Sequence, residues 1–224
     1  MIRSKEIKTQ LLDYIRWGIE DCDKCDLCGE HKNAVPGEGH VHATLMFVGE
    51  GPGAEEDRTG RPFVGRAGKL LDNMIASMEM KREDVFIANI VKHRPPNNRK
   101  PEPEEMQACI PFLYQQIYVI RPKIIVALGA TATEGLLGPG PGITKRRGQW
   151  GELKLIEREP GCPMEHSIPV MPTFHPSALL RRKEWKTDAW HDLQKVKKVL
   201  DSGLTPKQLS ASEAYAAKCE SVGW

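Results

Sequence analysis

The sequence has no long hydrophobic run, few aromatic residues and almost no excess of either charge. Its 224 residues contain no stretch near the roughly 20 consecutive apolar residues of a membrane-spanning helix, and residues 1–12 carry Lys and Glu where a signal peptide is apolar. Aromatic residues make up 6%, and 32 basic residues stand against 30 acidic ones, a formal net charge of +2. We therefore expect a cytoplasmic protein with no membrane partner, whose nucleic-acid contacts, if any, come from a local basic face.

The length and the 40% hydrophobic content suit one compact domain. We expect residues 1–203 to form this domain, residues 204–224 to form a C-terminal helical extension, and the protein to be a monomer. Six Cys are present, three of them as Cys22, Cys25 and Cys28, a spacing typical of metal or cluster ligation in a reducing compartment rather than of disulfides. Cys162 and Cys219 are expected to be free thiols.

Short apolar runs alternate with helical patterns along the chain. The runs predict buried strands at 44–48, 85–90, 124–128 and 169–174, and three- and four-residue apolar steps predict helices at 4–20, 67–78, 104–120 and 130–137. This order predicts an α/β fold with three layers, α/β/α, around a central four-stranded parallel sheet. Ligands of such sheets bind beyond the carboxyl ends of the strands, which here carry Gly49 to Gly53, Asn89, Gly129 and His175.

Two glycine-rich loops follow the first of these strands. Residues 49–53 read Gly-Glu-Gly-Pro-Gly, which allows a ligand to approach the backbone closely. Residues 58–68 form a basic, glycine-studded loop that enters a helix, a terminus that favours phosphate. Phe63 lies in this loop, where an aromatic ring either anchors the loop in the core or stacks on a base.

The next strand end, Asn89, also has two interpretations. A buried Asn commonly satisfies nearby backbone, but its amide could equally offer one donor and one acceptor to the edge of a planar ring. Basic residues follow beside a Pro-Pro turn, and they either track a phosphate backbone or form a solvated face: Lys92, Arg94, Arg99 and Lys100.

The last strand ends at His175, which precedes Pro176. A neutral imidazole at this edge can donate a hydrogen bond to developing negative charge, although a structural His remains the alternative. Leu179 and Leu180 come before a basic run that starts at Arg181. Two leucines expected at the surface, next to cations, are typical of a wedge that enters a duplex while its neighbours hold phosphates.

Taken together, these segments resemble the family 4 uracil-DNA glycosylases, which carry an iron–sulfur cluster. The resemblance runs from about Cys22 to Leu200, includes the stretch 143–148, and excludes only the C-terminal extension. Its motifs stand in the family's order: Gly49-Glu50-Gly51-Pro52-Gly53, Gly60-Arg61-Pro62-Phe63-Val64-Gly65, Asn89, and His175-Pro176-Ser177-Ala178-Leu179-Leu180-Arg181.

The resemblance implies an enzyme that flips uracil out of DNA, hydrolyses its N-glycosidic bond, and leaves an abasic site. It further implies that Phe63 stacks on the uracil, that Asn89 pairs with the uracil N3 and O4 edge, and that Glu56 helps to exclude the thymine methyl group. His175 is then placed near uracil O2, where it stabilises the leaving anion. Glu50, with the backbone around Gly51, is our candidate for the group that positions water or balances the sugar cation.

Two glycines, Gly51 and Gly53, are expected to border the uracil through their backbone. Gly51 stands where another branch of the superfamily places a carboxylate that holds the water, so this chain must orient its nucleophile differently. DNA contacts are expected from a further set of residues: Arg94, Lys145, Arg147, Leu179 and Arg181.

The family's 4Fe-4S cluster has four Cys ligands, and this chain departs from that set. The resemblance assigns the ligands here to Cys22, Cys25, His93 and Cys109, with His93 where the family has Cys. Histidine does ligate iron in Rieske centres. A rival assignment is a local zinc site at Cys22, Cys25, Cys28 and His31, since zinc accepts three thiolates and one imidazole.

The departure at His93 is shared with a related branch that becomes covalently attached to uracil-containing DNA. That branch also carries a nucleophilic His in a basic insertion, and residues 94–105 contain no His, so turnover is favoured over capture. Two alternatives stay open: a protein that binds or captures uracil-DNA with little turnover, and a zinc-stapled α/β scaffold with a basic loop.

Overall fold

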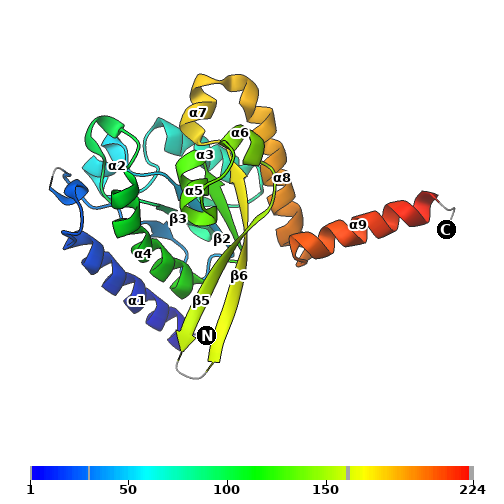
Figure 1. The fold of residues 1–224 in the computed structure, drawn as a ribbon, viewed down its shortest axis with the longest axis horizontal. Coiled ribbons are helices and arrows are strands. Elements are labelled where there is room, and N and C mark those ends of the chain that lie inside the picture. Colours follow the sequence, from blue (N-terminus) through cyan, green and yellow to red (C-terminus); the bar gives the residue numbers. More distant parts are fainter. Residues whose placement is uncertain (1, 30, 160–161, 222–224) are drawn as a thin grey trace.

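A computed structural model describes the backbone of residues 2–29, 31–159 and 162–221. It is built on a six-stranded mixed sheet with the strand order β1-β3-β2-β4-β6-β5 (Figure 1). The strands are β1 (Glu38–Gly39), β2 (Leu45–Gly49), β3 (Phe86–Asn89), β4 (Ile124–Leu128), β5 (Gly151–Glu159) and β6 (Cys162–Thr173).

The four predicted strands form the parallel centre of this sheet, but the prediction of a four-stranded sheet was incomplete. β1 and β5 pair antiparallel along its two edges. β1 has only two residues, too few for a periodic signal. In β5, charged residues interrupt the apolar ones, as expected of a strand that faces water along an edge.

The four predicted helices are confirmed and five more appear among the described residues. The predicted ones are α1 (Ile2–Glu20), α3 (Arg66–Ala76), α4 (Pro103–Ile120) and α5 (Ala130–Leu137). The others are α2 (Ala54–Thr59), α6 (Ile143–Arg146), α7 (Pro176–Arg181), α8 (Lys186–Ser202) and α9 (Pro206–Ser221).

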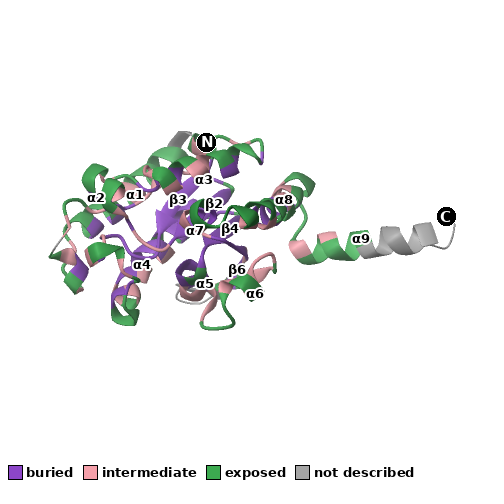
Figure 2. Cartoon of the chain, turned by 90° about the horizontal axis from the view of Figure 1, so that it is seen from above, coloured by how far each residue is buried: buried purple, intermediate pink, exposed green. Residues whose placement is uncertain are grey.

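Two apolar cores cover the two faces of the sheet, which explains the three layers. Alternate residues of β2 point to opposite faces, so Met46 joins the core with α1, α4 and α5, whereas Phe47 joins the core with α3, α7 and α8. Both residues are fully buried, and the sheet is the buried centre seen in Figure 2. Because the central strands are parallel, their carboxyl ends share one edge of the sheet.

The chain leaves this body at Gly203, which ends α8 with a left-handed φ of 66°. α9 starts at Pro206, within the range expected to form a helical extension, and projects away from the rest of the molecule (Figure 1). Residues 222–224 lie outside the described residues, as do the side chains of Cys162 and Cys219, and the division of the chain at residue 203 stays a prediction. In the described part of the chain, no helix has the length and apolar character needed to cross a membrane.

Candidate active site

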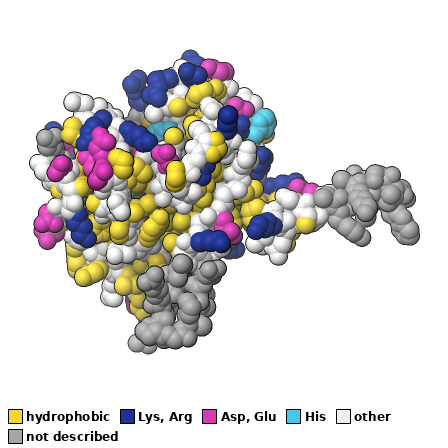
Figure 3. All heavy atoms as spheres, in the orientation of Figure 1, with side chains coloured by type: hydrophobic (Ala, Val, Ile, Leu, Met, Phe, Trp, Pro, Cys, Tyr) yellow, Lys and Arg dark blue, Asp and Glu magenta, His cyan; other side chains and the backbone are white. Residues whose placement is uncertain are grey.

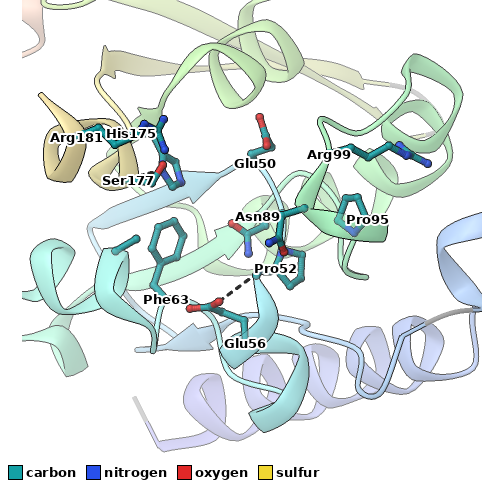
Figure 4. A pocket seen from close by; sticks show the side chains of 14 residues that line it. Glu50, Pro52, Glu56, Phe63, Asn89, Pro95, Arg99, His175, Ser177 and Arg181 are labelled. Carbon is teal, nitrogen blue, oxygen red and sulfur yellow. Dashed lines mark hydrogen bonds between the residues drawn. The ribbon is translucent and has the colours of Figure 1, made fainter.

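A cavity of about 420 Å³ opens at the edge where the parallel strands end (Figure 4). It gathers residues from three of the four strand ends predicted for the site and from the loop that carries Phe63, but Gly129 is not among its lining residues. The lining residues that were predicted for substrate, catalysis or DNA are Glu50, Gly51, Gly53, Glu56, Phe63, Asn89, His175 and Arg181.

Asn89 presents an unused hydrogen-bond acceptor to this cavity. Its side chain is 1% exposed, and its Oδ1 is buried without a hydrogen-bond partner among the described residues. Such an orphaned oxygen costs free energy unless a ligand satisfies it. An amide that serves only the nearby backbone does not account for this oxygen, so the geometry favours ligand recognition.

Gly49 makes the approach of two side chains to this point possible. It pairs with Asn89 across β2 and β3. A Cβ on Gly49 would lie 2.4 Å from Asn89 Oδ1 and 2.5 Å from Phe63 Cζ. Any side chain at position 49 would therefore occupy the space where the amide and the ring converge.

Phe63 is held in a strained backbone conformation. Its φ is 50°, a left-handed value that a residue with a bulky side chain rarely adopts, and its side chain is only 6% exposed. The ring centroid lies 5.6 Å from that of His175, and the two side chains are neighbours along one side of the cavity in Figure 4. The ring thus borders the cavity and also anchors its loop.

Glu56 joins the two glycine-rich loops. Its Oε1 accepts hydrogen bonds from the backbone N–H groups of Val64 (2.8 Å) and Gly65 (2.9 Å), and its Oε2 accepts one from Gly53 (3.1 Å). Three amide donors hold the carboxylate in one orientation beside the cavity. The expected role against a thymine methyl group stays a prediction.

His175 is held as a neutral imidazole with its proton on Nε2. Its Nδ1 accepts hydrogen bonds from the Ser177 backbone N–H (3.1 Å) and hydroxyl (2.8 Å), so Nε2 carries the proton. Burial, reinforced by the nearby charge of Arg181, lowers the pKa of His175 to about 4. At neutral pH the side chain is therefore an uncharged donor.

Replacement of Ser177 by Ala removes one of the two donors to Nδ1. Because these donors stabilise the neutral ring, we expect the pKa of His175 to rise and the acid limb of the activity profile to move up from near pH 4. At pH 7 the rate constant should fall about fivefold, the value of one net hydrogen bond of about 1 kcal/mol. Single-turnover rates measured between pH 4 and 8 check this, and an unchanged acid limb would contradict it.

Glu50 has a partner that the sequence did not reveal. Its carboxylate accepts a hydrogen bond from the hydroxyl of Thr131, which is 3% exposed near the start of α5. The two residues lie 81 positions apart, so no local pattern links them. Thr131 fixes the carboxylate at the mouth of the cavity, where Glu50 can orient a water molecule.

The predicted DNA-contact cations differ in their surroundings. Arg181 is exposed beside the cavity, and Lys145 is exposed on α6. Arg94 donates from Nε to Asn98 Oδ1 (2.9 Å), which places it in the turn that forms the cavity rim. Lys and Arg side chains gather over the end of the molecule formed by α7 (Figure 3).

Arg147 is used inside the protein instead. Its guanidinium pairs with Asp192, which is 0% exposed, through Nη2 and through Nε (2.9 Å), and Nη2 also donates to the Asp188 carbonyl (2.7 Å). Its cation also lies 5.6 Å from the centroid of the Phe174 ring. These contacts join α8 to the loop after α6 and take most of the donors that DNA contact would need.

The expectation that Leu179 is an exposed wedge was wrong. Its side chain is 1% exposed and belongs to the core with α3 and α8, whereas Leu180 is 40% exposed. In the helical turn of α7, one residue faces the sheet and its neighbour faces solvent. The exposed apolar position of this segment is therefore Leu180.

The thiols predicted as cluster ligands all contact the apolar core that includes residues of α1 and α4. Cys109 is 4% exposed, and Cys22 and Cys25 pack against the same core. Burial raises the pKa of the Cys109 thiol to about 11, and the neighbouring Cys25 and Cys22 contribute to the rise. The backbone N–H of Lys92 donates to Cys109 Sγ (3.1 Å).

His93 lies beside Cys28 and His31 and has one buried ring nitrogen without a partner among the described residues. It is 2% exposed, and its Nε2 is buried without a partner in the described part of the structure. Its Nδ1 is 3.7 Å from Cys28 Sγ, and its ring centroid is 4.2 Å from that of His31. A buried, unpartnered imidazole nitrogen among thiols fits a metal-bound group.

Neither of the two expected ligand sets is gathered around one point in this geometry. Across the described residues, no three His, Cys, Asp or Glu side chains converge as around a single metal ion. The donors of the cluster set come from the loop after α1, the segment after β3 and α4, whereas those of the zinc set all come from the loop after α1, and both assignments stay predictions.

Comparison with known proteins matches the model of the uracil DNA glycosylase superfamily to residues 36–194. The type-4 uracil-DNA glycosylase of Thermotoga maritima is 45% identical over 197 residues, which cover 85% of this chain and 95% of that protein. The chain belongs to the type-4 uracil-DNA glycosylases. The family member of Sulfurisphaera tokodaii is 44% identical over 202 residues, 88% of this chain and 87% of its own length. That of Pyrobaculum aerophilum is 44% identical over 178 residues, 78% and 87% of the two chains.

Membership of the type-4 glycosylases agrees with the geometry of the cavity. The superfamily match spans all of its lining residues, from Glu50 to Arg181. The family resemblance inferred from the motifs is thereby confirmed, and the cavity is the candidate active site of this type-4 glycosylase.

Proposed function

We propose that this protein is a DNA repair enzyme that releases free uracil from DNA by hydrolysis of the N-glycosidic bond and leaves an abasic site. The observation that carries the proposal is the convergence of three groups on one cavity: the orphaned amide oxygen of Asn89, the ring of Phe63 and the Nε2–H of His175. Each offers one of the contacts that a flipped uracil needs.

Recognition would rest on Asn89 and Phe63. The Asn89 Oδ1 accepts from uracil N3–H and the amide N–H donates to O4, a pattern that the exocyclic amine of cytosine reverses. Phe63 stacks on the base face, which contributes about 1–3 kcal/mol in comparable sites. The rigid backbone around Phe63 places the ring before the base arrives.

Catalysis would rest on stabilisation of the charges that develop as the bond breaks. The C–N bond breaks through an oxocarbenium-like state, and uracil leaves as an anion. His175, held neutral by burial, donates from Nε2 to uracil O2 as negative charge develops there. Glu50, fixed by Thr131, orients the attacking water and faces the positive sugar.

DNA would be held at the cavity mouth by a basic rim. Arg94 and Arg181 contact phosphates there, with Lys145 farther along α6, and Leu180 rather than Leu179 fills the space that the flipped nucleotide leaves. We further propose that the enzyme is a monomer. The free, unpaired thiols of Cys22, Cys25, Cys28 and Cys109 support a reducing, cytoplasmic location.

A 4Fe-4S cluster would be held by Cys22, Cys25, His93 and Cys109, and when bound it supplies a structural cross-link rather than a reacting group. Cys109 comes from α4 and His93 from the segment that continues from Asn89 into the Pro-Pro turn. Their ligation ties that turn, and with it the cavity rim, to α1. The Lys92 N–H donor orients the Cys109 sulfur.

The ligand assignment predicts a contrast between two neighbouring residues. His93→Ala should lower the bound iron from about four atoms per chain to a small fraction, whereas Cys28→Ala should keep the iron and the absorbance of the cluster. The two side chains lie 3.7 Å apart, so Cys28→Ala is a matched control. Iron and zinc analysis of both purified variants decides: loss of metal only in Cys28→Ala would contradict the assignment.

A gel assay tests the function. Oligonucleotides that differ only by uracil or thymine at one position are treated with enzyme and then alkali, and denaturing electrophoresis separates cleaved strands from protein–DNA adducts. The proposal expects alkali-dependent cleavage only at uracil and no adduct. An adduct without turnover would indicate covalent capture, and binding without either would indicate a recognition protein.

A further inference from the structure

Arg82 lies outside the cavity and yet contacts the segment that carries Phe63. It begins the short helical turn Arg82–Asp84 that precedes β3. All five of its N–H groups are used. The acceptors are Glu38 Oε1 (3.1 Å from Nε and 2.9 Å from Nη2), Asp72 Oδ1 (2.7 Å), Pro62 O (2.6 Å) and Phe63 O (3.2 Å).

Two of these acceptors are the consecutive carbonyls of Pro62 and Phe63. The planar guanidinium fits such a pair because its donors leave in fixed, divergent directions. Helix α3 also comes so close to the Phe63 carbonyl that a Cβ on Gly68 would lie 1.9 Å from its oxygen. The carbonyl is therefore both bonded by Arg82 and confined by α3.

The amide groups of the same loop are held separately. Glu56 accepts hydrogen bonds from the N–H groups of Val64 and Gly65, immediately after Phe63. Arg82 thus fixes the carbonyls of the two peptide groups that flank Phe63. Glu56 fixes the N–H of the second of these groups and the N–H of the next one. Between them Phe63 keeps its φ of 50°, a conformation that costs of order 1–3 kcal/mol and persists only where the surroundings impose it.

Two carboxylates hold the guanidinium itself in place. Glu38 belongs to the edge strand β1 and Asp72 to α3, so Arg82 is anchored to two different elements. Burial raises the pKa of Glu38, but hydrogen bonds from Arg61 and Arg82 outweigh it and hold that pKa below its ordinary value. Glu38 is therefore ionised at neutral pH.

We propose that Arg82 is a positioning residue for base recognition, which sets the Phe63 ring in its stacking position before uracil enters. The inference rests on the proposed function, because it assigns to Arg82 an effect on uracil that passes through Phe63. It explains why a guanidinium with every donor occupied lies behind Phe63, the aromatic lining residue with a left-handed backbone.

Arg61 offers a matched control. It also pairs with Glu38 (2.8 Å from Nε), but its side chain is exposed, and its guanidinium donates to Glu38 rather than to the loop carbonyls. Arg82→Lys keeps the charge but cannot reach both carbonyls and both carboxylates, so we expect kcat/KM for uracil release to fall roughly 10- to 100-fold, as for a misplaced binding group. Arg61→Lys should change it less than about twofold.

A double-mutant cycle separates positioning from a general structural effect. In a Phe63→Ala background the ring is absent, so Arg82→Lys should have almost no further effect on kcat/KM or on inhibition by free uracil. An equal loss in both backgrounds would overturn the proposal. Uracil release by the wild-type enzyme is measured first. If the wild type released no uracil, the result would contradict the proposed function itself rather than this inference.

A second variant guards against misfolding of Arg82→Lys. Asp72→Ala removes the anchor of Nη1, the group that also donates to the Phe63 carbonyl. It should lower kcat/KM in the same direction by a smaller factor, again only when Phe63 is present. A loss that persists without Phe63, or no loss at all, would contradict the proposal.

Discussion

Replacement of His175 by Asn is expected to lower the single-turnover rate constant of uracil release by about 10²–10³-fold, the usual effect of removing one donor to a developing oxyanion. The neutral imidazole presents Nε2–H in a fixed direction because Ser177 occupies Nδ1. A shorter amide cannot reach the same point or keep that orientation. Rapid-quench measurement with enzyme in excess gives the rate constant directly.

The matching control is His191→Asn, which changes an exposed His on α8 outside the cavity. It should leave the rate constant within about twofold of the wild type. Binding of uracil-containing DNA by the His175 variant should also change little, since His175 acts on charge that appears during bond cleavage. Equal losses in binding and in rate would argue that His175 is a structural residue.

Replacement of Gly49 by Ala is expected to abolish recognition without unfolding the protein. The added Cβ would lie 2.4 Å from Asn89 Oδ1 and 2.5 Å from Phe63 Cζ, so it displaces both base-contacting groups at once. Loss of the amide pairing and of stacking together predicts a fall in kcat/KM of at least about 100-fold. Steady-state kinetics and thermal unfolding of the same preparation check both parts.

Gly142→Ala provides the control for this substitution. A Cβ there meets nothing within 4 Å, and the backbone φ of −57° suits any residue. It should therefore alter neither activity nor unfolding temperature. If Gly49→Ala remained as active as Gly142→Ala, the cavity between Asn89 and Phe63 would not be the uracil site.

The parallel core and the place of the site could be predicted from the sequence because both follow from local patterns. Continuous apolar runs marked the four central strands, and the residues directly after them marked the cavity edge. Residues such as Gly49 and Asn89 adjoin strand ends, so their position followed from strand order alone. The edge strands left no such pattern.

Side-chain pairings between distant segments could not be predicted. In the sequence, Arg147 could not be distinguished from the other loop cations expected to contact DNA. In the structure, its guanidinium pairs with Asp192, which lies 45 positions away. Leu179 and Leu180 are chemically identical, and only the rotation of α7 decides which one is buried. The contacts of Arg82 with Glu38 span 44 positions and likewise depend on the assembled fold.

Quantification of free uracil tests the central claim most directly. The wild-type protein and Asn89→Ala are each incubated with a large excess of uracil-containing duplex, and the released base is measured by chromatography. The account predicts many uracils released per wild-type molecule, no thymine from a matched duplex, and a loss of about 100-fold or more in Asn89→Ala. Equal release by both proteins, or none by the wild type, would contradict it.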